Sequence, residues 1–310
     1  MTNPPARLRL GTRASALARW QAEWVAGELE KFGAEVELVE ISTDGDRQQS
    51  APIGSLGAQG VFTKQIQQAL LDGAIDLAVH SLKDLPTESI DGLKLAAVPP
   101  REMVNDVLVA RHAKTLDDLP DGAVVGTGSL RRRAQLLHLR PDLKVCEIRG
   151  NVDTRLRKLD EGQCDATLLA AAGLRRLGRS DRITQVLAPA VFLPAVGQGA
   201  LGIEVRGDDS DAIDAVGRLN DPLSHATVEA ERTLLAALEG GCRAPIGAWG
   251  RVVDGRLWLS AVVLSPDGGE RIYDEAAGEV TVPRSLGEHV AVDLLARGAG
   301  RLVDAARDAE

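Results

Sequence analysis

A basic stretch at residues 126–157 carries the side chains of this sequence that are best suited to bind an anion. It contains seven arginines and one lysine against three acidic residues, whereas the whole chain has 36 basic and 45 acidic residues. Guanidinium groups form paired, charge-assisted hydrogen bonds with carboxylate and phosphate groups. The stretch therefore predicts a local site for a ligand with several such groups, and not a field that covers the whole molecule.

The placement of these arginines supports that interpretation. Residues 123–127 are typical of a short buried strand, and a helix follows with Thr127 or Ser129 as its N-cap. Three arginines fall in the first turn of this helix, namely Arg131, Arg132 and Arg133. Because the helix dipole is positive at that end, each cation there costs about 0.3–1 kcal/mol unless an anion is bound nearby.

The same pattern recurs further along the chain. Residues 143–149 indicate a strand, residues 150–151 a turn, and residues 152–159 a helix with Arg155 in its early turns. Two helix starts rich in arginine suit an anion bound between them, where backbone N–H groups and guanidinium groups converge. Solvated surface arginine is the alternative for any single residue.

A carboxylate at the end of another predicted strand could take part in acid–base or electrostatic chemistry. Asp84 follows the predicted buried strand at residues 75–79, with Lys83 beside it and His80 close in sequence. A carboxylate there could be a general acid or base, or could stabilise a cationic intermediate. A helix cap or a surface ion pair explains Asp84 equally well, and no spacing supports a catalytic triad around His80.

One of the three cysteines has a context that differs from the other two. Cys242 follows the double glycine that ends a predicted helix, and Arg243 beside it would favour the thiolate. The alternative, a small packed cysteine, suits Cys146 and Cys164, which lie in or next to predicted strands. Spacing alone leaves both interpretations open for Cys242.

Composition excludes several classes of protein. A net charge of −9 and an aromatic content of 3% argue against a general DNA-binding protein and against base-stacking platforms. No signal peptide and no apolar run of 18 residues is found, so we expect a cytoplasmic protein that binds neither nucleic acid nor membranes. The cysteine spacing predicts neither disulfides nor a zinc site, and the glycine-rich runs lack the ending of a phosphate loop.

The predicted elements place most of these polar residues at comparable positions. Strands and helices alternate over the first 205 residues, which argues for parallel sheets with right-handed crossovers. Ligands of such sheets bind beyond the carboxyl ends of the strands. Five strand ends carry polar residues there: Arg13, residues 80–84, residues 127–132, Arg149 and Arg176.

The pattern changes after about residue 220. A helix is expected over 224–238, strands over 246–253 and 256–264 joined by an Asp254-Gly255 hairpin, a third strand over 269–275, and one last helix within 284–308. We therefore expect three domains. Residues 1–99 with 200–218 form the first lobe, including a lid-like loop at 43–59; residues 100–199 form the second lobe; residues 219–310 form a small α+β domain.

Seven runs of the sequence closely resemble the porphobilinogen deaminase family, and they occur in the family's order along nearly the whole chain. They are LGTRASALA (10–18), AVHSLKDLP (78–86), VGTGSLRRRAQL (125–136), RGNVDTRLRKLD (149–160), AAAGLRRLG (170–178), LPAVGQGALGIE (193–204) and LEGGCRAPIG (238–247). The resemblance implies an α/β enzyme with two doubly wound lobes like periplasmic binding proteins, plus a small C-terminal α+β domain.

The resemblance also implies an activity. Enzymes of this family are transferases of tetrapyrrole and heme biosynthesis that add four porphobilinogen molecules head to tail, release four ammonia molecules and form hydroxymethylbilane. Growth starts on a dipyrromethane cofactor, which a cysteine carries through a thioether, and Cys242 matches that cysteine. A monomer with porphobilinogen as its small-molecule partner is expected.

Individual residues match family positions with known roles. Asp84 matches the catalytic aspartate, which stabilises the azafulvenium cation that remains when porphobilinogen loses ammonia. Eleven residues match positions that bind the carboxylates of cofactor and substrate or lie beside them: Arg13, Ser15, Ser81, Lys83, Thr127, Ser129, Arg131, Arg132, Arg149, Arg155 and Arg176.

The sequence departs from the family at a few positions. Ser55 and Gln59 stand where many bacterial relatives have lysines, and Gly128 replaces a frequent serine. Arg133 and Arg157 have no firm family role. A two-lobed binding protein for a polycarboxylate and a phosphate-using transferase are the alternatives, and a covalent pyrrole adduct on Cys242 distinguishes the enzyme from both.

Overall fold

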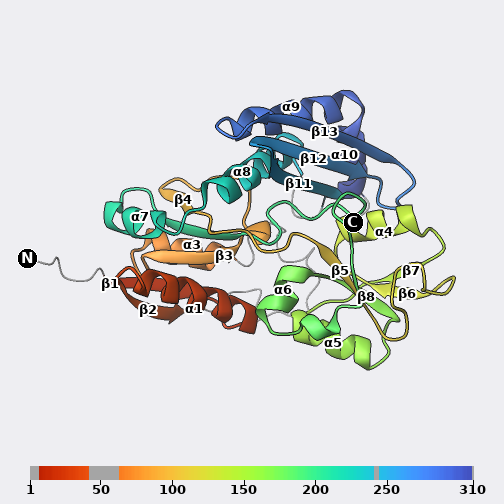
Figure 1. Ribbon diagram of the computed structural model, residues 1–310, viewed down its shortest axis with the longest axis horizontal. Helices are drawn as coiled ribbons and strands as arrows, with labels where there is room; N and C mark the ends of the chain where they lie inside the picture. Colours follow the sequence, from red (N-terminus) through yellow and green to blue (C-terminus); the bar gives the residue numbers. More distant parts are fainter. Residues whose placement is uncertain (1–6, 42–62, 241–243, 309–310) are drawn as a thin grey trace, which may run out of the picture. The chain divides into compact units, whose positions relative to one another are not determined.

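The computed structural model describes residues 7–41, 63–240 and 244–308. The predicted lid at 43–59 with Ser55 and Gln59, and also Cys242, lie outside these residues. By its internal contacts the chain divides into two compact units, Met1–Arg101 with Ala200–His225, and Glu102–Gly199 with Ala226–Glu310 (Figure 1). The predicted three-domain division is not tested by this result and stays a prediction.

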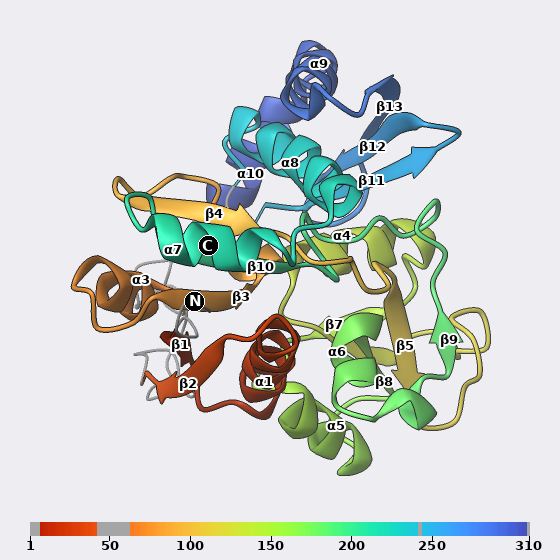
Figure 2. The same ribbon diagram turned by 60° about the vertical axis from the view of Figure 1, so that its left-hand side comes forward.

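The first unit contains a five-stranded sheet of order β2-β1-β3-β10-β4. Its strands are β1 (Arg7–Thr12), β2 (Glu35–Glu40), β3 (Leu77–Ser81), β4 (Leu93–Ala97) and β10 (Leu201–Arg206). Helices α1 (Ala16–Glu30) and α7 (Ser210–Gly217) pack apolar side chains on one face, and α3 (Lys64–Leu71) packs on the other. Figure 2 shows α7 beside β4 and β10.

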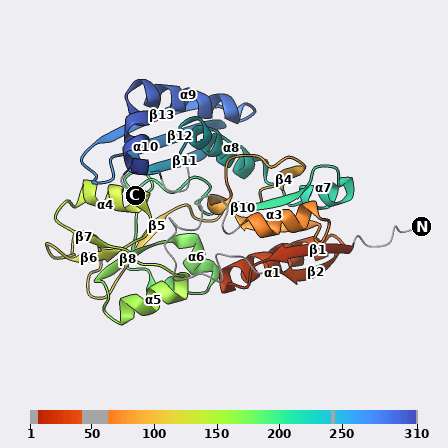
Figure 3. The same cartoon turned by 180° about the vertical axis from the view of Figure 1, so that it is seen from behind.

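The second unit holds another five-stranded sheet, of order β7-β6-β8-β5-β9. Its strands are β5 (Asp106–Ala110), β6 (Val124–Gly126), β7 (Lys144–Cys146), β8 (Ala166–Ala170) and β9 (Gln185–Val186). Helix α4 (Leu130–Leu139) covers one face, while α5 (Val152–Asp160) and α6 (Ala171–Arg176) cover the other (Figure 3).

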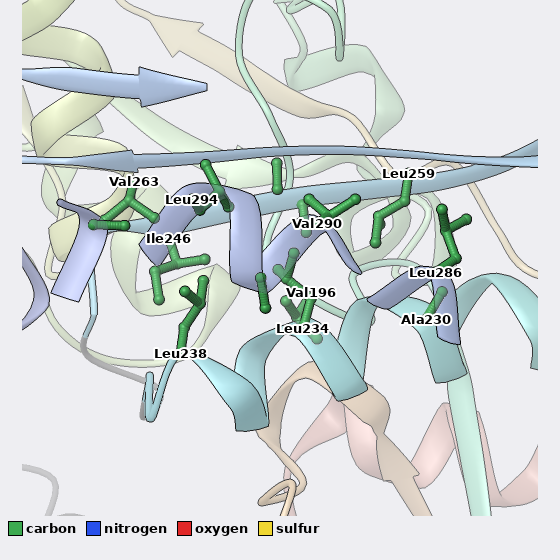
Figure 4. Close-up of a cluster of buried hydrophobic side chains, with 14 of the residues drawn as sticks. Val196, Ala230, Leu234, Leu238, Ile246, Leu259, Val263, Leu286, Val290 and Leu294 are labelled. Carbon is green, nitrogen blue, oxygen red and sulfur yellow. The ribbon is translucent and has the colours of Figure 1, made fainter. Parts of the chain in front are cut away.

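A three-stranded antiparallel sheet completes the second unit. It consists of β11 (Ile246–Val253), β12 (Arg256–Leu264) and β13 (Arg271–Glu279). One face packs on α8 (Pro222–Ala237), α9 (Pro283–Ala296) and α10 (Ala299–Asp308) in a core that Figure 4 shows. The predicted Asp254-Gly255 hairpin is confirmed, with positive φ values of 51° and 73° at its two central residues, as a tight hairpin turn requires.

Two expectations about the elements are wrong. The sheets are not wholly parallel, because β10 runs antiparallel to β3 and β4, and β5 runs antiparallel to β8 and β9. No helical crossover within the same sheet leads into β5 or β10, so the crossover rule that suits β1–β3 and β6–β8 does not apply to them. The single helix expected within 284–308 is two helices, α9 and α10, separated at Gly298, whose φ of 92° no helix accommodates.

Candidate functional site

The carboxyl ends of β1 and β3 bring together the predicted site residues of the first unit. The two strands are parallel neighbours, with Gly11 opposite Ala78. Arg13 follows β1 directly, and the next turn ends at Ser15, whose hydroxyl caps α1 by accepting a hydrogen bond from the N–H of Ala18. Ser81 is the last residue of β3, so two parallel strand ends present polar side chains at one edge.

A short 3₁₀ turn, Leu82–Asp84, continues β3 and presents the candidate catalytic carboxylate. Leu82 is buried and its N–H donates to the carbonyl of Ala200, which anchors the turn, whereas Asp84 is exposed. Among the residues that the structure describes, Asp84 has no hydrogen-bond or ion-pair partner. The alternatives of a cap or a surface ion pair therefore find no support within those residues.

Sequence reasoning missed a buried glutamine at this edge. Gln21, on α1, donates a hydrogen bond of 2.8 Å from Nε2 to the Ser81 hydroxyl and thereby fixes the end of β3 to α1. A polar residue within the apolar stripe of a predicted helix is the signal that could have found it. Such a residue is buried at a cost unless a partner satisfies its amide.

In the second unit, the ends of three neighbouring parallel strands, β7, β6 and β8, form a second polar edge. Thr127 follows β6 and is buried, and its hydroxyl accepts a hydrogen bond from the N–H of Ser129. Of the two N-caps considered for α4, Ser129 is confirmed, because its hydroxyl accepts from the N–H of Arg132. The helix starts of this edge are thus built as the sequence predicts.

Three further arginines belong to the same edge. Arg149 lies after β7 and forms an ion pair with Glu147, with 2.6 Å between Nε and Oε1. Arg155, on α5, donates from Nε to the carbonyl of Gly150, and Arg176, at the end of α6, donates from Nη2 to the carbonyl of Gly199. Burial lowers the pKa of Arg176 from its ordinary value.

Arg131 and Arg132 are buried, and their guanidinium groups share the carboxylate of Asp106. Nη1 of Arg131 lies 2.5 Å from Oδ2, and Nε and Nη2 of Arg132 lie 2.9 and 2.7 Å from Oδ1. Burial alone would raise the pKa of Asp106, but the two guanidinium charges outweigh it and hold that pKa well below its ordinary value. The anion that these arginines predict is in part a carboxylate of the chain itself.

Two other arginines and one thiol of the second unit differ from the predicted site residues. Arg133 is exposed, and Arg157 forms an exposed ion pair with Glu161, as suits residues that the prediction left out of the site. Cys164 is buried, and burial raises the pKa of its thiol to about 11, which agrees with the packed role expected for it. Within the described residues no group of three or more His, Cys, Asp or Glu side chains could hold a metal ion.

Two family models match the chain. The model described as "Porphobilinogen deaminase, dipyromethane cofactor binding domain" matches residues 8–214, and the one described as "Porphobilinogen deaminase, C-terminal domain" matches residues 225–296. The porphobilinogen deaminase of Desulforudis audaxviator is 51% identical over 95% of this chain and 96% of its own. That of Pelobacter propionicus is 49% identical over 97% of both chains.

The solved structures that match the chain are more distant. A lipoprotein from Bacillus subtilis is 15% identical, with a TM-score of 0.44 over 69% of this chain and 89% of its own. A nutrient-binding protein from Burkholderia cenocepacia bound to methionine is also 15% identical, with a TM-score of 0.44 over 74% and 94%. At these values the likeness carries no argument. No helix among the described residues is long and apolar enough to cross a bilayer.

Proposed function

The chain belongs to the porphobilinogen deaminase family. We therefore propose that Asp84, on the polar sheet edge of the first unit, and the cationic side chains of the polar sheet edges of both units carry out the condensation of porphobilinogen. The chain is a transferase of tetrapyrrole biosynthesis, which joins four porphobilinogen molecules onto a dipyrromethane primer and releases ammonia and hydroxymethylbilane. The roles of individual residues are our proposal.

The donor groups of the second edge suit a dipyrromethane, whose pyrrole rings bear acetate and propionate carboxylates. Thr127 and Ser129 contribute hydroxyl groups, and five arginines contribute guanidinium groups: Arg131, Arg132, Arg149, Arg155 and Arg176. Each charge-assisted hydrogen bond contributes about 1.5–3 kcal/mol, so the set can hold a polycarboxylate firmly. When bound, the cofactor supplies the pyrrole carbon to which the first substrate is joined.

We place the attachment of this cofactor at Cys242. The support is the run LEGGCRAPIG at 238–247, which matches the family at its cofactor cysteine. A second line of support is that Cys164 is unsuited to the task, since burial raises the pKa of its thiol to about 11 and keeps it un-ionised at neutral pH.

At the first edge, Asp84 faces the charge that develops on the substrate. The amino group of porphobilinogen is protonated as an ammonium. The bond between the aminomethyl carbon and this nitrogen breaks, ammonia leaves with the bonding electron pair, and the ring becomes a cation delocalised toward its pyrrole N–H. The Asp84 carboxylate accepts a hydrogen bond from that N–H and stabilises the cation. Arg13 and Lys83 bind the acidic side groups of the same ring, with Ser15 and Ser81 as their polar neighbours.

The observation that carries this assignment is the exposed carboxylate of Asp84, which lacks a partner among the described residues and sits on an anchored turn at the strand end. Asp84→Asn is expected to fold normally and to lose about 100-fold or more in kcat, measured by porphobilinogen consumption and ammonia release. Asp91→Asn, at another exposed aspartate of the same unit, is the matched control and should keep wild-type kcat. Equal turnover in the two variants would remove Asp84 from the chemistry.

The proposal includes a monomeric protein that works in the cytoplasm without nucleic-acid or membrane partners. Sedimentation velocity at micromolar concentration checks the first point: a single species of about 33 kDa is expected from the chain mass of 32.8 kDa. A species of twice that mass would contradict the proposed monomer and indicate a dimer, without bearing on the proposed chemistry.

A further inference from the structure

We propose that Asp106 is a positioning residue of the anion-binding edge, where its buried carboxylate fixes the guanidinium groups of Arg131 and Arg132 for a carboxylate of the cofactor. This inference rests on the proposed function, because it assigns the ligand of that edge. Asp106 belongs to none of the sequence runs that carry the family resemblance. It does not contact the ligand itself and acts on ligand binding only by positioning the two arginines.

Strand direction brings Asp106 to this edge. It is the first residue of β5, and β5 runs antiparallel to β8, so Asp106 lies opposite Ala170 at the carboxyl end of β8. In a wholly parallel sheet, the first residue of β5 would lie at the opposite edge, away from Thr127 and Arg149. The reversal of this strand therefore supplies an acidic residue where the parallel strands supply cations.

The carboxylate is held on all sides. Besides the three bonds from the two arginines, Asp106 Oδ1 accepts a hydrogen bond of 3.1 Å from Nε2 of Gln198, which also donates to the carbonyl of Val104. Asp106 has no exposed surface. A buried carboxylate that accepts four hydrogen bonds has one stable orientation. It therefore also fixes the orientation of the groups that donate those bonds.

The guanidinium of Arg131 is fixed from three directions. Nη1 also donates to the carbonyl of Leu193 at 2.6 Å, and the ring of Phe192 lies 6.0 Å from Cζ. Gln135 holds Leu193 in turn through bonds to both its N–H and its carbonyl. Nε and Nη2 of Arg131 bind no residue that the structure describes, so donors remain for a ligand.

The charges do not balance within this cluster. Two guanidinium groups meet one carboxylate, and among the described residues Asp106 is the only acidic partner of either arginine. One positive charge stays uncompensated in a buried place, which is costly unless an external anion neutralises it. Asp106 thus both orders the two arginines and leaves a net charge that suits one ligand carboxylate.

The test compares Asp106→Asn with Asp76→Asn in the full chain. Asp76 is a fair control because it also receives hydrogen bonds from two arginines, Arg9 and Arg206, but precedes β3 at the edge away from the site. Intact mass gives the fraction of purified chains that carry pyrrole units. We expect this fraction to fall about tenfold or more in Asp106→Asn and to stay at the wild-type level in Asp76→Asn. Wild-type loading in a folded Asp106→Asn would overturn the proposal.

A second readout does not depend on the enzyme's reaction. Citrate, a tricarboxylate, should raise the melting temperature of the unloaded wild-type chain above that in sodium chloride of equal ionic strength, and the rise should be absent in Asp106→Asn. An equal rise in both proteins, or none in the wild type, would overturn the role of Asp106. A wild type that takes up no pyrrole units from porphobilinogen, yet responds to citrate, would overturn the proposed function alone.

These comparisons require that the Asp106→Asn chain folds. If it does not fold, the Asp106→Glu variant tests the proposal instead. This variant keeps the charge but displaces the carboxylate by one methylene group. A folded Asp106→Glu should load less cofactor than wild type, since two guanidinium groups must shift. Full loading in that variant would show that the position of the carboxylate is unimportant and would overturn the proposal.

Discussion

His80 and Glu204 meet within the first unit, with 2.9 Å between Nε2 of the imidazole and Oε2 of the carboxylate. Both side chains are buried, and Gln67 on α3 donates to the same carboxylate at 3.0 Å. His80 therefore points to the α3 face of β3, whereas its neighbour Ser81 binds Gln21 on α1. Successive side chains of a strand point to opposite faces of the sheet. His80 therefore belongs to a buried structural cluster with Glu204 and Gln67, whereas Ser81 belongs to the polar edge that precedes Asp84.

Removing the acceptor of this cluster should cost stability. Glu204→Ala removes the acceptor of the Gln67 amide and the carboxylate that lies 2.9 Å from Nε2 of His80, and we expect a loss of about 1–3 kcal/mol in the free energy of unfolding. Urea denaturation measures it. Glu37→Ala, which removes an exposed ion pair with Arg7, should cost less than about 1 kcal/mol. Equal losses in the two variants would contradict a structural role for the His80–Glu204 pair.

The sequence predicts local structure well and long-range pairing poorly. The predicted bounds of β11 and β12 agree with the structure, and the polar residues do follow the ends of β1, β3, β6, β7 and β8. These features depend on apolar runs and turn residues that lie next to one another in the chain. The direction of β5 depends on its partner β8, more than 50 residues away, and no local pattern encodes it.

Burial is the second thing that the sequence leaves open. Arg131 and Arg132 lie in a basic stretch, which suggests an exposed cluster, yet both are buried against Asp106. An acidic residue at the start of the apolar run DVLVA is a usable signal, because a buried carboxylate needs cationic partners elsewhere in the chain. The sequence does not tell which cations those partners are.

Variants that each remove one of two similar helix caps test whether the polar sheet edge of the second unit binds the cofactor. Ser129→Ala and Asn151→Ala each remove a side-chain cap, of α4 and α5 respectively, and each should cost about 1 kcal/mol of stability. Only Ser129→Ala should also lower the fraction of cofactor-loaded chains, and Ser129→Thr should restore it. Equal loading in both alanine variants would show that Ser129 is only a cap.

Acid stability should depend on Asp106. Its pKa is lower in the folded than in the unfolded chain, because the two guanidinium charges outweigh the effect of burial. The unfolded chain therefore binds this proton first as pH falls, so the contribution of Asp106 is full above about pH 4 and is lost progressively below it. The free energy of unfolding, measured in urea from pH 5 to pH 3, should fall less steeply for Asp106→Asn than for wild type. Parallel curves would mean that the ion pairs do not form.

The anchor of the cofactor gives the most direct chemical test. Cys242→Ser should fold but purify without pyrrole units, because a serine hydroxyl is a far weaker nucleophile than a thiolate. Cys164→Ser is the control: that thiol is buried, and its pKa of about 11 keeps it un-ionised, so the variant should purify with the cofactor at the wild-type level. Intact mass and peptide mapping locate the adduct. An adduct on any residue other than Cys242, or a fully loaded Cys242→Ser enzyme, would contradict the attachment site.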